Sequence, residues 1–394
     1  MQFTCRWAKH SKIFDIVGCF VATRIATVQP SSAPKFRIPA SGVIVSTFLM
    51  MGFLGACAQM GPEALVTGRP QYNIAVQQTE AEQLLLNIVR QRYNDPILFL
   101  DVTSISSGFS RGVNGSLLGS FGSGSNNGAG SVGGDFRENP YIFYAPNNGE
   151  KFVRQMLTPL NIRTIALILQ AGWSIERVML LLGESANQLY NRPGDNEAGN
   201  RYVQFLDVAK SLRDLQRNNQ LIVGLEPGEQ EGESALVLII TPDAAGSESY
   251  LLVCKAIGIA CDGQPIRLRP AFGAPVDGKT LAIATRSLFS VIYHLSRHVD
   301  APQTDIEDGI VSPAPDSYAE SSGGTSALSR LFRVRSSELE PEVASVKVFY
   351  RDTWFYIEDT DQDSKTTFAL LSMLITLQSG DTIGVTPLIS LPTG

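Results

Sequence analysis

A serine placed between two glycines is the strongest candidate nucleophile in the sequence. Gly108-Phe109-Ser110-Arg111-Gly112 has the Gly-x-Ser-x-Gly pattern, in which a strand leads into a sharp turn that exposes the serine hydroxyl. His294 and His298 follow in the chain and are candidates for the general base. The pattern also requires a helix after the turn, whereas Val113-Asn114-Gly115 and further glycines follow here. A serine hydrolase that uses Ser110 is therefore the alternative hypothesis rather than the leading one.

A second pattern would bind phosphate. Gly273 to Thr280 matches the Gly-x4-Gly-Lys-Thr loop, which normally follows a buried apolar strand and opens a helix at its Lys-Thr pair. Here Arg267 and Pro270 precede the loop, and Leu281 to Thr285 alternates like a strand that returns from a turn at Asp277-Gly278. The sequence therefore predicts no nucleotide and no other cofactor.

Two further patterns suggest metal ligands. His294 and His298 are four residues apart on a predicted helix, so both could bind one ion, but both fall beside the apolar stripe and indicate a solvated helix flank. Residues 359–363 open like a calcium loop, but Ser364 replaces the required glycine and Leu370 replaces the bidentate glutamate. Acidic residues before Ser364 are typical of a helix start. We predict no metal site.

Cys57 is the residue for which the sequence best supports a covalent modification. Residues 42–56 carry no charge, follow two basic residues and end in small residues, which indicates an export signal covering residues 1–56. This run is shorter than the roughly 20 residues that a helix needs to span a bilayer, so we expect cleavage. Leu54-Gly55-Ala56-Cys57 resembles the lipobox of bacterial lipoproteins. That resemblance implies a lipid on Cys57 and, with Ala58 after it, an outer-membrane location facing the periplasm.

Charge and cysteine content restrict the partners. The leader holds six of the 32 basic and one of the 38 acidic residues, so 26 basic and 37 acidic residues remain and the net charge becomes −11. This balance disfavours nucleic acid as a partner. The expected partners are the membrane, through lipidated Cys57, and other envelope proteins. Cys254 and Cys261 could form a disulfide in an exported protein, and their spacing also suits a short hairpin or two buried thiols.

Composition and periodicity predict an α+β fold, with a helical N-terminal half and a mixed C-terminal half. Residues 57–78 are polar and predict a tether. Residues 79–218 predict a mainly helical region with a Gly-rich hairpin over 97–144, whose glycines favour a loose tip over a ligand cradle. Residues 219–394 predict an α+β region with a flexible insertion at 302–325.

Apolar periodicity also places the individual elements. Helices are expected from a capping box at Thr79 to Tyr93 and over 150–157, 162–170, 175–182, 202–216, 286–299 and 364–378. Strands are expected over 97–105, 141–144, 221–225, 235–241, 250–255, 265–268, 281–285, 345–350, 354–358 and 386–391.

Three stretches together resemble an uncharacterised family of envelope lipoproteins from Gram-negative bacteria. They are Arg69 to Asn73 running into Glu82 to Arg90, then Thr285 to Leu288, and finally Trp354 to Ile357 with Ser364 to Leu371. The resemblance implies an envelope location but no activity. The leading hypothesis is a lipid-anchored protein with a binding or structural role. An accessory subunit of an export or assembly complex, docking through its Gly-rich segment and residues 302–325, is a further alternative.

Overall fold

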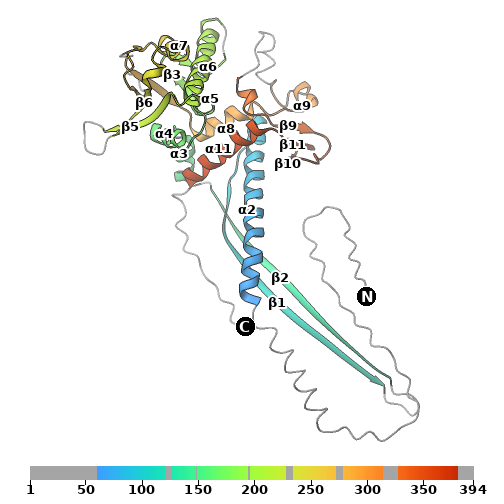
Figure 1. The fold of residues 1–394 in the computed structure, drawn as a ribbon. Coiled ribbons are helices and arrows are strands. Elements are labelled where there is room, and N and C mark those ends of the chain that lie inside the picture. Colours follow the sequence, from blue (N-terminus) through green and yellow to red (C-terminus); the bar gives the residue numbers. More distant parts are fainter. Residues whose placement is uncertain are drawn as a thin grey trace, which may run out of the picture. The chain divides into compact units, whose positions relative to one another are not determined.

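The chain has an α+β fold in a computed structural model that describes residues 60–120, 127–147, 149–193, 196–227, 234–271, 278–313 and 327–379 (Figure 1). It divides into two compact units. Of the described residues, the ribbon unit comprises those within 60–70 and 102–145, and the body unit those within 71–101 and 146–379. The predicted α+β fold class is confirmed.

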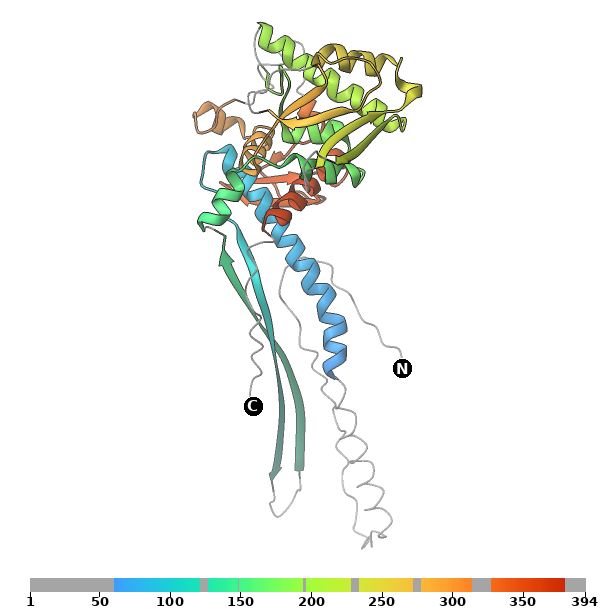
Figure 2. The same ribbon diagram turned by 90° about the vertical axis from the view of Figure 1, so that its left-hand side faces the viewer.

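The ribbon unit contains the predicted Gly-rich hairpin, whose strands are longer than expected. β1 (Leu100–Ser120) and β2 (Asn127–Pro146) form a two-stranded sheet. Near its base, the Thr103 hydroxyl donates a hydrogen bond to the Phe143 carbonyl over 3.2 Å. Figures 1 and 2 show the two strands side by side along their length.

Helix α2 (Met60–Arg92) begins much earlier than predicted. The expected tether over 57–78 is wrong from Met60 onward, because the polar stretch is helical and continues through Pro70. The capping box expected at Thr79 is also wrong, since the Thr79 hydroxyl donates to the Val76 carbonyl inside the helix (2.9 Å). A threonine three residues before a glutamate therefore marks an internal turn here, not a helix start.

Two side-chain amides of α2 bind the chain that leads into β1. The Asn87 amide donates to the Leu98 carbonyl (2.8 Å) and accepts from its N–H (3.1 Å). Four residues earlier, the Gln83 amide makes the same pair of bonds with Leu100 (3.2 and 2.7 Å). Because Asn87 is fully buried, these amides satisfy backbone groups that would otherwise lose their water.

The helical block that follows agrees closely with prediction. α3 (Glu150–Leu157), α4 (Ile162–Gln170) and α5 (Ile175–Leu182) have the expected bounds, and α6 (Asn196–Arg217) starts earlier than expected. Asn161 caps α4 and Ser174 caps α5 through side-chain oxygens that accept from backbone N–H groups.

A six-stranded sheet in the order β4-β3-β8-β7-β6-β5 joins both predicted regions of the body unit. Because β3 pairs with β8, the regions predicted on either side of residue 218 share this sheet. β7 and β8 pair in parallel, so the hairpin expected at Asp277-Gly278 is wrong, although the strand after it is confirmed. The strands are β3 (Gly183–Ala186), β4 (Leu189–Tyr190), β5 (Leu221–Pro227), β6 (Ser234–Ile240), β7 (Ile266–Pro270) and β8 (Thr280–Thr285).

The strand predicted over 250–255 is wrong, because these residues lie in helix α7 (Glu248–Ile257), which follows a short 3-10 helix, η2 (Pro242–Ala244). The Ser247 hydroxyl accepts from the Tyr250 N–H at the start of α7, and Gly258 ends the helix with φ of +72°. The buried side chains of α7 recur at helical rather than alternating spacing; they are Tyr250, Val253, Cys254 and Ile257.

The C-terminal part adds helices and a second sheet. The predicted insertion at 302–325 begins with a short helix, α9 (Gln303–Glu307). Its residues 314–325 lie outside the described residues. The strand expected at 386–391 also lies outside them. The remaining helices are α8 (Leu288–Ser296), the 3-10 helix η3 (Ala327–Arg330) and α11 (Gln362–Ser379). A three-stranded antiparallel sheet has the order β10-β11-β9. Its strands are β9 (Arg335–Ser337), β10 (Val346–Tyr350) and β11 (Thr353–Ile357).

The body unit has one contiguous apolar core. Leu85 and Ile88 of α2 belong to the same buried cluster as Phe205 of α6 and Phe355 of β11. Segments from both predicted regions therefore fold around shared apolar side chains, which explains why neither forms a domain alone.

Candidate functional site

The predicted lipidation residue, Cys57, lies outside the described residues, which begin with α2 at Met60. Among the helices that the structure describes, none combines the length and the apolar composition needed to cross a bilayer. Lipid attachment at Cys57 therefore stays a prediction from the sequence.

The structure does not place Ser110 on a nucleophile elbow. The backbone of Gly108 to Gly112 lies inside β1, which continues as a strand to Ser120. An elbow needs a strand that turns sharply into a helix, because the turn exposes the serine and the helix N-terminus helps to bind the oxyanion. The hydrolase alternative is therefore not supported by the local backbone.

The end of the apparent phosphate loop also has the wrong structure. Residues 272–277 lie outside the described part, but Thr280 begins strand β8, where a phosphate-binding loop would begin a helix. Gly278 has φ of +71°, which a glycine adopts without strain. Lys279 and Thr280 therefore lead into the sheet and do not form a helix N-terminus.

His294 lies in α8 and His298 in the turn after it, and the predicted solvated flank is wrong for His298, which is buried. The His298 Nδ1 lies 3.2 Å from the His294 carbonyl, and the two rings are edge-on with centroids 6.0 Å apart. Within the described ranges, no group of three or more His, Cys, Asp or Glu residues could hold a metal ion.

Burial of His294 makes the free energy of unfolding depend on pH. Desolvation lowers the pKa of His294 well below its usual value, and the positive charges of Arg286, His298 and Arg297 lower it further, while a backbone interaction with Leu180 opposes the shift. The unfolded chain binds a proton at this residue near pH 6.5. Between about pH 7.5 and 5.5 the unfolded state therefore gains a proton that the folded state excludes.

We expect the free energy of unfolding to fall by about 1 kcal/mol from this group as the pH drops through that range. Urea denaturation at four pH values will measure it. His294→Gln will show a shallower pH dependence than wild type. Equal pH dependence in the two proteins would show that His294 is protonated to the same extent in both states.

The acidic residues at 359–363 cap α11, as predicted. The Asp361 carboxylate accepts from the Ser364 N–H (3.0 Å) and from its hydroxyl (2.6 Å). The Lys365 ammonium pairs with Asp359 at 2.7 Å, and Asp363 pairs with Arg177 at 2.6 Å. All three carboxylates therefore already have partners.

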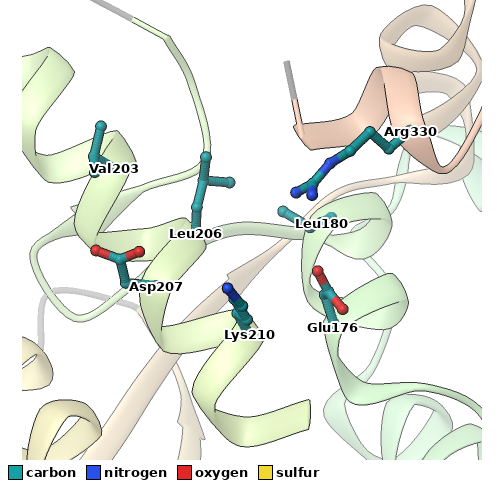
Figure 3. A pocket seen from close by; sticks show the side chains of 7 residues that line it. All are labelled: Glu176, Leu180, Val203, Leu206, Asp207, Lys210 and Arg330. Carbon is teal, nitrogen blue, oxygen red and sulfur yellow. The ribbon is translucent and has the colours of Figure 1, made fainter. Parts of the chain in front are cut away.

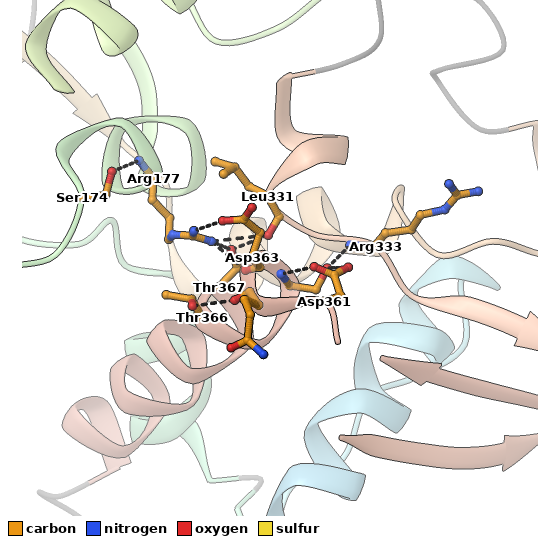
Figure 4. A network of polar contacts seen from close by, with 10 residues as sticks. Ser174, Arg177, Leu331, Arg333, Asp361, Asp363, Thr366 and Thr367 are labelled. Atoms are coloured by element: carbon orange, nitrogen blue, oxygen red, sulfur yellow. Dashed lines mark hydrogen bonds and ion pairs between the residues drawn. The ribbon is translucent and has the colours of Figure 1, made fainter. Parts of the chain in front are cut away.

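Arg177 links α5 to the C-terminal helix (Figure 4). Its guanidinium, 9% exposed, donates to the Asp363 carboxylate and backbone carbonyl (2.6 and 2.7 Å) and to the Thr367 hydroxyl. The Thr367 hydroxyl donates in turn to the Leu331 carbonyl over 2.6 Å. The cluster has the charged residues of a binding site, but its groups are used to join three segments.

A second buried arginine, Arg286, binds the C-terminal end of α5. It donates to the carbonyls of Gly183 (2.7 Å), Asn191 (2.9 Å), Leu180 and Leu181 (both 3.2 Å). Burial lowers the pKa of Arg286 to about 10, so the group stays charged near neutral pH. The last carbonyls of a helix have no partner inside the helix, and this cation supplies one.

A small pocket between α5, α6 and η3 has mixed charge (Figure 3). Lys210 lies between Glu176 and Asp207, and Arg330 reaches toward the same space from η3. Leu180, Val203 and Leu206 complete the lining, and the volume is about 200 Å³. Two acids and two bases in so small a space select neither anions nor cations, and ligand pockets usually exceed roughly 300 Å³.

The ribbon unit offers the clearest candidate for a binding surface. Four consecutive large apolar or aromatic residues near the end of β2 are exposed: Tyr141 by 63%, Ile142 by 43%, Phe143 by 55% and Tyr144 by 57%. Within the described strands, β1 and β2 pair only with each other, so each presents one unpaired backbone edge. Such an edge can pair with a strand of another chain. We refer to Tyr141–Tyr144 as the aromatic run.

The sequence predicts a strand over residues 141–144 but gives the aromatic run no role, because the exposure of its side chains cannot be read from the sequence. Comparisons with protein-family models, with curated proteins and with solved structures found no match.

Proposed function

We propose that the chain is a lipid-anchored protein of the cell envelope, attached through Cys57, whose ribbon binds another envelope protein. The observation that carries the binding role is the exposed aromatic run on a two-stranded ribbon with unpaired edges. A two-stranded hairpin is only marginally stable in water, so binding a partner would stabilise it.

The partner is a protein that offers both a strand edge and an apolar surface. Backbone pairing along β2 would supply affinity, and the rings of Tyr141 and Phe143 would supply specificity. The export signal and lipobox support an envelope location for this partner. The role is one of attachment, since the segment around Ser110 lacks the backbone of a nucleophile elbow.

Photocrosslinking in intact cells tests the proposal. A photoreactive phenylalanine analogue at Tyr141 or Phe143 is expected to yield the same envelope-protein adduct from both positions. Phe349 in β10 is the matched control because it is 54% exposed but belongs to the body unit. With the purified partner, the double variant Tyr141→Ser, Phe143→Ser should bind about tenfold more weakly or worse.

Equal adduct yield from Phe349, or adducts of the chain with itself alone, would contradict the proposed ribbon interface. The anchor is tested separately by incorporation of a labelled fatty acid. Cys57→Ala should abolish the label, and labelling that persists would refute attachment at this residue.

A further inference from the structure

The body unit brings two cysteines together at the C-terminal end of α7. Cys254 lies in the last turns of the helix and is buried, whereas Cys261 is exposed in the segment that follows. Gly258 takes a left-handed conformation, and the next residue, Ile259, donates its N–H back to the Cys254 carbonyl over 3.0 Å. The chain therefore turns back over the helix end, and the neighbouring Cys261 thiol is one of the groups that raise the pKa of Cys254.

Neighbouring contacts hold the returning segment on both sides of Cys261. The Ala260 N–H donates to the Gly278 carbonyl (2.9 Å), and the Gly263 N–H donates to the Tyr250 hydroxyl (3.2 Å). Tyr250 precedes Cys254 by about one turn of α7. Cys261 is therefore held beside Cys254 by backbone contacts on either side.

We propose that Cys254 and Cys261 are a reversible dithiol–disulfide pair, in which the exposed Cys261 reacts first and the buried Cys254 completes the bond. The co-reactant is a small-molecule disulfide such as oxidised glutathione. The Cys261 thiolate attacks one of its sulfurs, and the other half leaves as a thiol once protonated. The Cys254 thiol then gives up its proton and attacks the Cys261 sulfur, which releases the second half. Two protein thiols are oxidised and one disulfide is reduced to two thiols.

The order of attack follows from the environments of the two sulfurs. Burial raises the pKa of the Cys254 thiol to about 12, so near neutral pH it is protonated and a poor nucleophile. Cys261 is exposed to the reagent. Once Cys261 carries the mixed disulfide, its sulfur lies next to Cys254 and the second step is intramolecular.

Peptide mapping of the full chain tests the bond directly. Trypsin cleaves after Lys255, so Cys254 falls in peptide 218–255 and Cys261 in peptide 256–267, while the other three cysteines fall in different peptides. After treatment with oxidised glutathione under native conditions, we expect these two peptides to be joined, with a mass two hydrogens below their sum. Reductant should separate them. This in vitro test does not depend on lipidation or on the proposed partner.

Single variants test the order of attack. Cys254→Ala should stop at a glutathione adduct on peptide 256–267, whereas Cys261→Ala should leave peptide 218–255 unmodified. Limiting iodoacetamide on the native wild-type chain provides a measurement without substitution, and it should label Cys261 at least about tenfold faster than Cys254. A linked pair that forms only in denaturant, or equal labelling of the two cysteines, would overturn the proposal.

Discussion

Replacing Arg286 with methionine will lower the free energy of unfolding by about 3–5 kcal/mol. Methionine retains most of the packing volume but removes every donor from a group that serves four backbone carbonyls. Asn191 continues to donate to the carbonyls of Leu180 and Gly183 (both 2.8 Å), but the remaining acceptors lose their partner in a buried site. The cost is that of stripping hydrogen bonds from buried polar groups.

Urea denaturation followed by circular dichroism will measure this effect. The matched control is Arg154→Met, because Arg154 pairs with Glu150 on the surface, where their side chains are 76% and 83% exposed. That variant should change the unfolding free energy by less than about 0.5 kcal/mol. Similar losses in the two variants would mean that Arg286 contributes only through the volume of its side chain. Arg286→Lys should lie between wild type and methionine, since one ammonium cannot reach all four carbonyls.

Arg177→Met is expected to cost about 2–4 kcal/mol. The guanidinium is nearly buried, whereas its carboxylate partner on Asp363 is 58% exposed and can return to water. The loss therefore comes mainly from the Asp363 backbone carbonyl and the Thr367 hydroxyl, which lose a donor. Because these bonds join α5 to α11, the effect should be concentrated in the C-terminal helix.

Hydrogen exchange read by mass spectrometry will locate that effect. In Arg177→Met the amides of residues 362–379 should exchange faster, while those of β5 and β6 should change little. Asp363→Asn is the control, because it keeps the backbone carbonyl and the Thr367 contact and should lose less stability. An equal loss in the two variants would assign the stabilisation to the exposed ion pair instead.

Helices with strong periodicity were predictable from the sequence, whereas elements built by distant contacts were not. α3, α4 and α5 have the expected bounds because their apolar residues recur at helical spacing next to good caps. The run at 250–255 is apolar up to Lys255, so its period could not distinguish a strand from a helix. Ser247 and Gly258 were the signals that could have decided it.

The candidate chemistry failed for a related reason. Ser110 and Lys279 match motifs by letter, but a motif functions only in its backbone context, and both lie in or next to strands. The burial of His298 could likewise not be predicted from the local sequence, because its environment depends on segments far away in the chain. Arg177 and Arg286 make buried hydrogen bonds that join separate segments of the body unit, and neither residue belongs to a catalytic motif.

The three stretches singled out in the sequence contain several structural contacts of the body unit. Asn87 binds Leu98, Arg286 binds the end of α5, and the Ser364 hydroxyl accepts from the Arg333 N–H (2.9 Å). These residues therefore have structural roles in the body unit.

The amides of Gln83 and Asn87 have a consequence for the stability of the chain that leads into β1. Each side-chain amide makes the pair of hydrogen bonds that a peptide group of a neighbouring strand would make. Two successive turns of α2 therefore bind the backbone at the start of β1. The amide protons of Leu98 and Leu100 are thus held by a helix and not by a sheet. Melting of those turns would therefore remove the side-chain hydrogen bonds that hold the backbone of Leu98 and Leu100.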